Sequence, residues 1–348
     1  MAAAAHLQID YPRLADIRQH SAAWWHDVLA IVQYSPELRP PRLPWAEGTA
    51  AHVRLPVLAD LDDAVEVWRL AGPMSSGQHG RVHYRCSERL LFAALSIAEQ
   101  EFAEPECERP QGDERASALR SATSAAYCEL FGALGALGFP HPIRIWNVLP
   151  EITGQTPDGE RYWHFNGGRQ EAFIGRQRHI DGNLPAASAL GSPHPGPLTV
   201  HCIASVRAPI ALENPRQSPA WEYPPQYGPR SPTFARACIE GSPGQTLFVS
   251  GTASIVGSHS AHPGDVRAQT RETVRNLRAV LAAANAHLGS ERYALEQLTF
   301  KVYVRHSDDL ADIEQELRSA IGPSARVLYL RADICRRELL VEIEAVGS

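Results

Sequence analysis

Lysine is almost absent from this sequence. Lys301 is the only lysine among 33 basic residues, so arginine carries nearly all of the positive charge. Acidic residues outnumber basic ones and the net charge is −6, whereas a nucleic-acid-binding protein normally carries a basic excess. The charge balance therefore argues against nucleic acid as a partner. The arginines nevertheless offer planar, two-pronged donors for any carboxylate that must be held.

Long apolar runs are missing as well. No stretch approaches the ~18 apolar residues that a bilayer-spanning helix needs, and the N-terminal segment lacks the pattern of a secretory signal peptide. The cysteines, at positions 86, 107, 128, 202, 238 and 335, are scattered and form no CxxC pair. In a large cytoplasmic chain such cysteines are expected to be free thiols. We therefore expect a soluble, cytoplasmic protein that does not bind membranes.

The motifs of several catalytic classes are absent too. There is no GxSxG elbow and no HExxH pair. Gly132, Gly135 and Gly138 lack the preceding strand and the spacing of a phosphate-binding loop. His259 and His262 could share a ligand set, but no clustered acidic residues or cysteines accompany them. The sequence therefore supports no metal site and indicates no cofactor.

The first part of the chain is irregular. Proline-rich loops are predicted at 35–45 and 104–115, a strand at 81–86, helices at 88–102 and 116–137, and a strand at 141–152. Residues 164–180 and 213–232 are long and loop-like, with arginines and aromatic residues interleaved. Loops of this length in a compact domain are usually functional or disordered. The aromatic residues argue against disorder.

From about residue 243 the pattern becomes regular. It predicts a strand at 244–251, an amphipathic helix at 265–285, a strand at 298–305, a helix begun by Asp308 or Asp309, and two strands at about 326–332 and 338–346. The order β-α-β-α-β-β predicts a compact α+β unit.

The last predicted strand contains two carboxylates. Glu342 and Glu344 lie two residues apart in “LLVEIEA” and point to the same face. Carboxylates in an apolar strand are costly unless they are paired, hydrogen-bonded or used in chemistry. Either glutamate could simply pair with an arginine. Cys335, seven residues before Glu342, is either a small buried apolar residue or part of the same site.

Several segments carry a family resemblance. “FVSGTASI”, “DVRAQTRETVRNLRAVLAAAN”, “TFKVYVRHSDDLADIEQELR” and “LLVEIEAV” resemble the RidA/YjgF-like fold, which is chorismate-mutase-like. Denser motifs from about residue 140 onward, among them “RIWNVLPEITGQ”, “ERYWHFNGGRQEAF”, “LPAASALG”, “ENPRQSPAWEYPPQYGPRSPTFARA” and “ADICRRELLVEIEA”, are similar to the chorismatase family. The resemblance implies an α+β protein in which a RidA/YjgF-like catalytic domain (201–348) packs on a diverged N-terminal α+β domain (1–200).

The resemblance also implies an activity. Chorismatases remove pyruvate from chorismate without a cofactor, and members similar to this chain give 3-hydroxybenzoate, alone or with 4-hydroxybenzoate. Other members hydrolyse the ether to a dihydroxycyclohexadiene carboxylate. A RidA-like imine deaminase or metabolite-binding protein is the alternative from another class. Because RidA-type folds often trimerise, the oligomeric state is open between monomer and trimer.

By family position, the proton donor to the enol methylene of chorismate is Glu342. An ordinary glutamate pKa of about 4.3 is too low for this task, and burial would raise it. Cys335 matches the aromatising members, in which it acts on the ring hydroxyl or excludes water. Ala253 stands where a strict 3-hydroxybenzoate former is expected to have glycine, which leaves room for a mixed product.

The two carboxylates of chorismate need cationic or hydroxyl partners, and arginine can pair with a carboxylate through two hydrogen bonds. By family position these partners are Arg169 and Tyr223. Arg216, Tyr227 and Arg230, from the same loop as Tyr223, are looser candidates for substrate binding.

Overall fold

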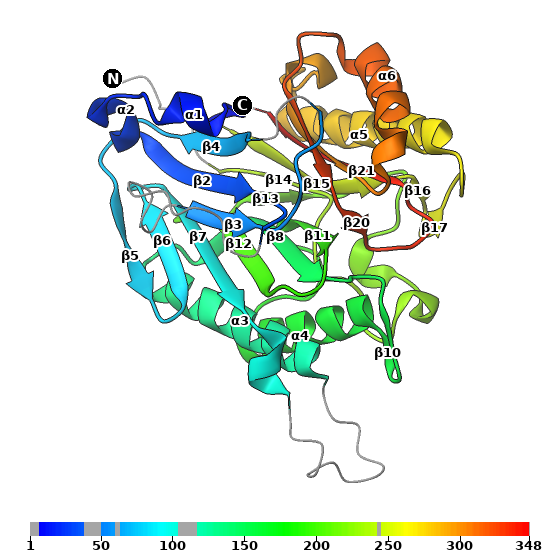
Figure 1. The fold of residues 1–348 in the computed structure, drawn as a ribbon, viewed down its shortest axis with the longest axis horizontal. Coiled ribbons are helices and arrows are strands. Elements are labelled where there is room, and N and C mark those ends of the chain that lie inside the picture. The colour runs from blue at the N-terminus through cyan, green and yellow to red at the C-terminus, as the bar shows by residue number, and fades with distance from the viewer. Residues whose placement is uncertain (1–6, 38–49, 60–62, 104–116, 242–244, 348) are drawn as a thin grey trace.

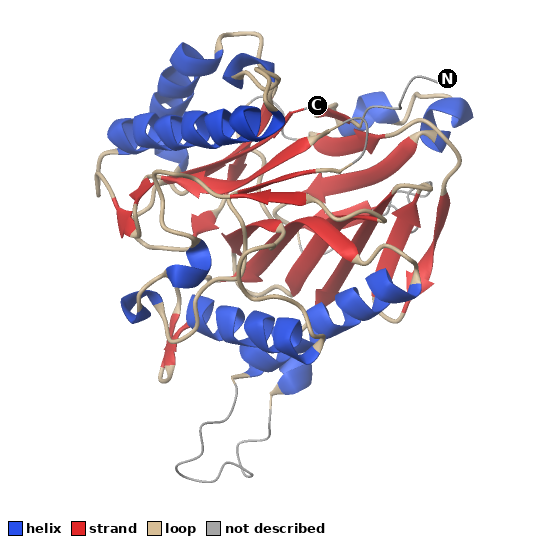
Figure 2. Ribbon diagram, turned by 180° about the vertical axis from the view of Figure 1, so that it is seen from behind, coloured by secondary structure: helices blue, strands red, loops and turns tan. Residues whose placement is uncertain are grey.

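The computed structural model describes residues 7–37, 50–59, 63–103, 117–241 and 245–347. Two layers of β-sheet lie face to face, and helices cover the outer side of each layer (Figures 1 and 2). Among the described residues, the largest groups of buried apolar side chains lie between the sheets and beneath the long helices on each side, with a smaller group beneath the N-terminal helices. The mixed α+β class expected from the sequence is confirmed.

A seven-stranded sheet with the order β20-β11-β8-β12-β7-β6-β5 forms one layer. Its strands are β5 (Ser75–His79), β6 (Val82–Cys86), β7 (Leu90–Ile97), β8 (His141–Pro150), β11 (Ala186–Ser192), β12 (Leu198–Ser205) and β20 (Asp333–Ile334). Helices α3 (Ala118–Ala136) and α4 (Arg161–Gly175) pack on its outer face (Figure 1). Aromatic residues such as Tyr127, Phe131 and Phe173 fill this interface.

A six-stranded sheet with the order β13-β14-β15-β21-β18-β19 forms most of the other layer. Its strands are β13 (Ile210–Leu212), β14 (Ala237–Ile239), β15 (Leu247–Ala253), β18 (Thr299–Val304), β19 (Val327–Arg331) and β21 (Val341–Gly347). Helices α5 (Val266–Leu288) and α6 (Leu310–Ile321) cover its outer face with Leu277, Leu281 and Leu317. Asp265 caps α5 by accepting a hydrogen bond from the Ala268 amide, and this order of elements is the one predicted.

A smaller sheet of four strands, in the order β1-β4-β2-β3, packs on the same inner face beside the six-stranded sheet (Figure 1). It consists of β1 (Gln8–Asp10), β2 (Val28–Tyr34), β3 (Ala50–Val53) and β4 (Val65–Arg69), with the short helices α1 (Leu14–Ile17) and α2 (Ala22–His26) outside it. The hairpins β9 (Gln155–Thr156) with β10 (Gly159–Glu160), and β16 (Ile255–Val256) with β17 (His259–Ser260), complete the strands.

Large aromatic side chains join the two sheet layers. Trp68 of β4 stacks on Phe248 of β15 at a centroid distance of 5.9 Å and meets Trp146 of β8 edge-on at 5.7 Å. Each of these side chains comes from a different sheet. The contact fixes how the three sheets lie relative to one another, and it therefore also fixes the walls of any cavity between them.

Two predictions of secondary structure were wrong. Residues 88–102 were expected to be a helix, but they form β7 and a 3₁₀ turn at Glu99–Phe102. Because β7 is buried on both faces between β6 and β12, its apolar residues form a run without the alternation that identifies a half-exposed strand.

Residues 164–180 were expected to be a loop, but helix α4 continues to Gly175. The glycines responsible for the error serve helix packing. A Cβ atom on Gly168 would lie 2.1 Å from the Arg120 carbonyl oxygen, so α4 can approach α3 this closely only with glycine at that position. The predicted loop at 213–232 is confirmed, apart from two single 3₁₀ turns.

The segment at 104–115 and most of 35–45 lie outside the described residues. Five of the cysteines are described and all five are free thiols. In the described part of the chain, no helix is long and apolar enough to cross a bilayer. The division into domains 1–200 and 201–348 stays a prediction.

Candidate active site

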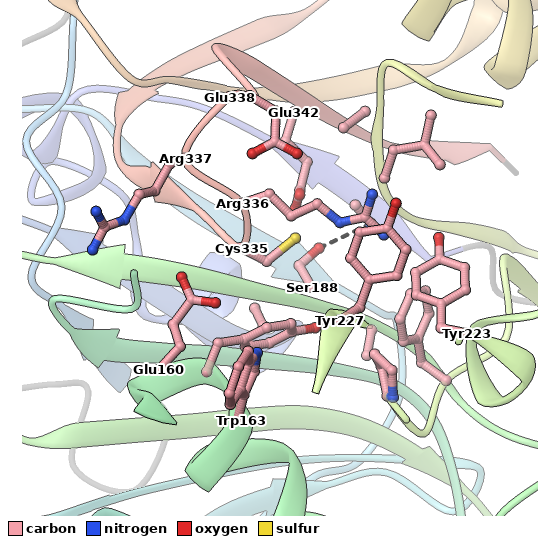
Figure 3. A pocket seen from close by; sticks show the side chains of 18 of the residues that line it. Glu160, Trp163, Ser188, Tyr223, Tyr227, Cys335, Arg336, Arg337, Glu338 and Glu342 are labelled. Atoms are coloured by element: carbon pink, nitrogen blue, oxygen red, sulfur yellow. Dashed lines mark hydrogen bonds between the residues drawn. The ribbon is translucent and has the colours of Figure 1, made fainter. Parts of the chain in front are cut away.

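A cavity of about 360 Å³ lies among strands β11, β15 and β21 and helix α4. Strands β11, β15 and β21, helix α4, the loop that contains Tyr223 and the segment 335–338 supply its lining. Figure 3 looks into it, with Glu342 and Arg336 above Cys335, the two tyrosines Tyr223 and Tyr227 at one side, and Trp163 opposite the acid. The volume falls in the range that small-molecule sites occupy.

Glu342 supplies the only carboxyl group of β21 that lines the cavity. Its neighbours Val341 and Ile343 point to the opposite face and pack beneath α5 and α6. The side chain is buried, and its Oε1 atom makes no hydrogen bond with any described residue. Burial, followed by the charge of Glu344, raises the pKa of Glu342 to about 8. This carboxyl group therefore carries a proton at neutral pH.

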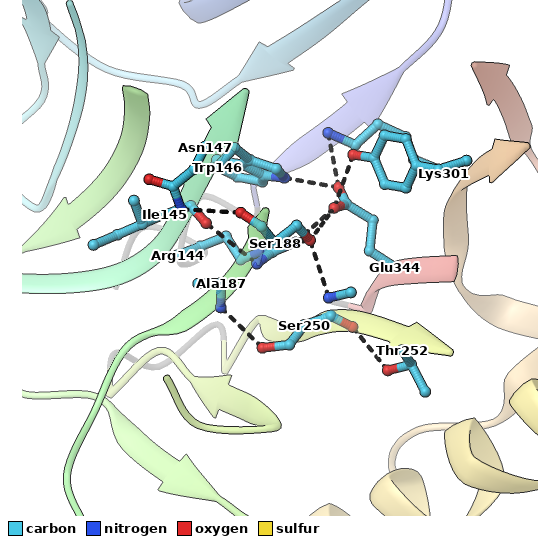
Figure 4. Close-up of polar contacts among 12 residues, drawn as sticks. Arg144, Ile145, Trp146, Asn147, Ala187, Ser188, Ser250, Thr252, Lys301 and Glu344 are labelled. Carbon is cyan, nitrogen blue, oxygen red and sulfur yellow. Dashed lines mark hydrogen bonds and ion pairs between the residues drawn. The ribbon is translucent and has the colours of Figure 1, made fainter. Parts of the chain in front are cut away.

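Glu344, two residues further along the same face, has the opposite environment (Figure 4). Its two oxygens meet Lys301 Nζ at 2.8 Å, Trp146 Nε1 at 2.8 Å, Arg144 Nη2 at 2.6 Å, Ser188 Oγ at 2.9 Å and Tyr303 OH at 3.0 Å. Burial opposes ionisation, but Lys301 and Arg144 outweigh it and lower the pKa of Glu344 to about 2. The alternative that Glu344 pairs with an arginine is thus confirmed.

Cys335 lies between β20 and β21 and lines the cavity beside Glu342. Its side chain also packs against Ala253, Ile255 and Leu339. Burial, together with the nearby Glu342, raises the pKa of the thiol to about 12. Cys335 is therefore a neutral thiol, which can donate a weak hydrogen bond but is not a nucleophilic thiolate.

Three buried arginines on the cavity, Arg169, Arg236 and Arg336, each keep one N–H group without a hydrogen-bond partner among the described residues. That group of Arg236, Nε, lies 4.0 Å from Glu213 Oε2. Arg169 of α4 donates from Nη2 to Asn166 Oδ1 at 2.9 Å, and its Nε has no hydrogen-bond partner among the described residues. Arg336 donates from Nη1 to the Ser258 carbonyl at 2.9 Å, and its Nη2 is likewise unpartnered within the described chain. Because an unpaired buried donor is costly, these N–H groups are suited to bind an anion.

Aromatic rings hold the guanidinium groups in place. The Arg336 guanidinium carbon lies 3.7 Å from the Tyr227 ring centroid. Tyr223 accepts a hydrogen bond of 2.7 Å at its hydroxyl oxygen from Arg236 Nη2. Such cation–π and hydrogen-bond contacts fix the cavity walls before a ligand arrives.

The structure does not bring all of the predicted residues together. Arg169, Tyr223, Tyr227, Ala253, Cys335 and Glu342 line the cavity. Arg216 and Arg230 are absent from its lining. Arg216 instead forms an ion pair with Glu272 and donates to Asn276 Oδ1 at 3.0 Å on helix α5, and Arg230 is exposed to solvent.

Sequence reasoning missed Arg236 and Arg336. Arg336 follows Cys335 directly, and Arg236 stands directly before the short strand β14, so each lies inside a motif that carried the family resemblance. With arginines throughout the sequence, charge alone did not indicate which of them are buried. The nearby Ser188 was missed as well, because nothing in the local sequence distinguishes a serine that faces a cavity from any other serine.

Together, these groups place a protonated acid on a cavity that is also lined by arginines and aromatic rings, with the carboxyl groups of Glu160 and Glu338 on the lining as well. Such a site can bind a ring compound that carries carboxylates and can donate a proton to it. No cluster of three His, Cys, Asp or Glu side chains suited to a metal ion occurs among the described residues.

Comparisons with known proteins identify the family. A chorismatase of Streptomyces rapamycinicus is 36% identical over 313 residues, which cover 86% of this chain and 87% of that protein. The chain belongs to the chorismatase family. Residues 66–204 match the family model described as “Chorismatase FkbO/Hyg5-like, N-terminal”. The resemblance expected from the sequence is confirmed.

Two further relatives are informative. A protein named 3-hydroxybenzoate synthase, from Streptomyces hygroscopicus, is 40% identical over 235 residues, which cover 65% of this chain and 68% of that protein. A chorismatase crystal structure superposes over the full length of both chains with a TM-score of 0.85 and 27% identity. The fold described above is therefore the chorismatase fold.

Proposed function

We propose that this chorismatase cleaves the enolpyruvyl ether of chorismate and releases pyruvate together with 3-hydroxybenzoate. The observation that carries the proposal is the Glu342 carboxyl group, which is protonated at neutral pH and has a free oxygen on a cavity with buried arginine donors. The names of the relatives at 36% and 40% identity support the same chemistry.

In the first step, Glu342 gives its proton to the methylene carbon of the enolpyruvyl group. A C–H bond forms, the carboxyl O–H bond breaks, and the ether carbon becomes an oxocarbenium ion. Carbon accepts protons slowly, so the acid must be held against it in the protonated form. A pKa of about 8 meets this requirement, because it keeps most of Glu342 protonated at neutral pH.

The second step determines the product. Water can attack the oxocarbenium carbon, which consumes one water molecule and leaves the ring as a dihydroxy diene. Alternatively, the oxygen of the neighbouring ring hydroxyl bonds to the ether-bearing ring carbon as the bond from that carbon to the ether oxygen breaks, which releases pyruvate and the hydroxyl proton. The resulting epoxide then opens at one C–O bond, the ring loses one proton and the oxygen gains one, so an aromatic phenol forms without consumption of water. Cys335, a neutral thiol beside Glu342, favours the second route by occupying the space that water would need.

Substrate binding follows from the unused donors. Arg169 Nε and Arg336 Nη2 are assigned to the substrate carboxylates, and Tyr223 and Tyr227 form the wall against which the ring lies. Ala253 pairs directly with Glu342 across strands β15 and β21 and lines the cavity. Its methyl group lies at the position associated with product choice, and we propose some 4-hydroxybenzoate as a second product.

The experiment is to incubate the protein with chorismate and to separate the products by chromatography. The amount of pyruvate is expected to equal the sum of 3-hydroxybenzoate and a smaller amount of 4-hydroxybenzoate. A non-aromatic diene as the sole product would overturn the assignment of the second step. Unchanged chorismate would overturn the proposed function as a whole. In D₂O, the pyruvate methyl group, trapped at once as lactate, is expected to carry one deuterium from the acid.

A further inference from the structure

The chain has a single lysine, and it lies at the centre of a buried ionic cluster outside the cavity. Lys301 on β18 contacts Glu344 at 2.8 Å and Glu66 on β4 at 2.9 Å, and its ammonium nitrogen lies 3.2 Å from the Tyr34 hydroxyl oxygen. All of these side chains are buried. A buried ion pair seldom adds much stability over apolar packing, so stability alone is a weak reason for this cluster.

The cluster reaches the cavity through one serine. Ser188 on β11 donates a hydrogen bond from Oγ to Glu344 Oε2 at 2.9 Å and accepts one from the Gly251 amide at 3.0 Å. Gly251 in turn forms the surface against which the Glu342 carboxyl rests, since a Cβ atom there would lie 2.0 Å from Glu342 Oε1. An unbroken set of contacts therefore runs from Lys301 to the acid.

The charges of this cluster also act on the Glu342 carboxyl group. The titratable and charged groups that influence the Glu342 carboxyl are Glu344 on β21, Arg144 on β8, Arg236 before β14, Arg305 after β18, Cys335 before β21 and Tyr162 on α4. The three arginines favour ionisation of Glu342, and Glu344 is the nearby carboxylate that opposes them. Two side chains at alternate positions of a strand are about 7 Å apart.

We propose that Glu344, held as a carboxylate by Lys301 and Arg144, is a positioning residue for the Glu342 acid and acts through Ser188 and the Gly251 amide. The inference rests on the proposed function, because that function assigns Glu342 the role of proton donor. It adds that the charge of Glu344 offsets the arginines beneath the cavity, so the acid keeps its proton. It also adds that the Ser188 bridge holds the backbone against which the acid rests.

The first test is the pH dependence of kcat/KM for chorismate in a Glu344→Gln variant. In the unsubstituted protein, kcat/KM should fall as the pH rises through about 8, because Glu342 loses its proton there. In Glu344→Gln this fall should move to lower pH by about one unit, because a negative neighbour about 7 Å away is removed while Arg144 remains. If the ion pair had only a structural role, Glu344→Gln would lower the melting temperature and leave the pH profile of kcat/KM unchanged.

Tyr303→Phe is the matched control. It removes a neutral donor from the same Glu344 oxygen, to which the tyrosine hydroxyl donates at 3.0 Å, without changing charge or touching Gly251. Its pH profile should match that of the unsubstituted protein. An unmoved profile in Glu344→Gln, or an equal shift in Tyr303→Phe, would overturn the inference.

A second variant covers the case in which Glu344→Gln does not fold. Ser188→Ala leaves the Lys301 and Arg144 contacts to Glu344 in place. It removes the hydrogen bonds of the serine itself, which join Glu344 and Arg144 to the Gly251 amide. We expect kcat to fall about tenfold or more with little change in KM, because the acid is misplaced while the arginine donors remain. An unchanged kcat would contradict the claim that Ser188 helps to position the acid through Gly251.

Failure of the proposed function would be seen separately, as a lack of chorismate turnover by the unsubstituted protein. In that case the titration of Glu342 can be followed directly by the infrared C=O band of its protonated carboxyl group. The inference then predicts that Glu344→Gln shifts this titration to lower pH, and an unshifted band would overturn it.

Discussion

The Glu342 carboxyl group on β21 lies so close to Gly251 on β15 that only a glycine fits at position 251. A Cβ atom on residue 251 would lie 2.0 Å from Glu342 Oε1 and 2.8 Å from Ser188 Oγ. The glycine is not required by its backbone dihedral angles, since its φ is not among the positive values. It is required by the space that the acid occupies.

Replacement of this glycine is therefore expected to displace the acid. Gly251→Ala should reduce kcat for chorismate by about 100-fold, because a misplacement of about 1 Å at a reacting group has an effect of this size. Gly135→Ala on helix α3, where a Cβ atom would meet nothing within 4 Å, is the matched control. Equal kcat values for both variants would contradict the steric argument.

The neutral thiol at Cys335 is expected to influence the product. Cys335→Ala opens space for water beside the oxocarbenium carbon, so the ratio of products should shift from 3-hydroxybenzoate toward the non-aromatic diene. Chromatographic quantification of both products measures the ratio. Cys128→Ala, on helix α3 and away from the cavity lining, serves as the control. An unchanged ratio in Cys335→Ala would make this residue a packing residue only.

Arg336 should contribute to binding more than to chemistry. Arg336→Met retains part of the apolar stem and removes the guanidinium, including the unpartnered Nη2. KM for chorismate should rise about tenfold or more, with a smaller effect on kcat, because a charge-assisted pair to a carboxylate is lost. The exposed Arg207 lies outside the cavity lining and provides the matched Arg207→Met variant. A KM equal in both variants would remove Arg336 from the site.

The protonated acid should also reduce the stability of the fold. The pKa of Glu342 lies at about 8 in the folded protein against an ordinary value of 4.5. Between these pH values the folded state holds a proton that the unfolded state has lost, so stability falls as the pH rises through this window. Glu342→Gln should therefore unfold less readily than the unsubstituted protein, by up to about 3 kcal/mol at pH 7 and by little at pH 4.

Thermal or denaturant unfolding at several pH values measures this difference. Glu344→Gln is the informative comparison, because the Glu344 carboxylate that it replaces has a pKa lowered to about 2 and is paired with cations. That variant should be destabilised at neutral pH. If Glu342→Gln lost as much stability at pH 7 as Glu344→Gln, Glu342 would be an ionised, paired carboxylate and not a protonated acid.

Local sequence patterns predicted much of the C-terminal half. The closing strand was found because apolar residues alternate with Glu342 and Glu344, and α5 because its apolar residues recur at helical spacing. The patterns failed where burial hides periodicity, as in β7, and where glycines serve a close helix contact, as at Gly168 in α4.

The difference between the two glutamates could not be read from local sequence. Glu344 is saturated with donors because Arg144, 200 positions earlier, and Ser188, 156 positions earlier, come from strands of the opposite layer. Glu342 escapes these donors because Gly251 leaves room for its carboxyl at the cavity. Only the family resemblance separated them in advance, and the importance of Lys301 depends wholly on the three-dimensional packing.

The most direct test of Glu342 as the acid combines turnover and binding in one variant. Glu342→Gln has nearly the shape and neutral charge of the protonated glutamate but no proton that it can donate. Pyruvate release from chorismate should fall by at least about 100-fold. Calorimetry should show that the variant still binds chorismate, with a Kd close to the Kd of the unsubstituted protein for a slow or non-reactive analogue of chorismate. Pyruvate release that stayed within a few-fold of the unsubstituted rate would contradict the assignment and place the proton donor elsewhere.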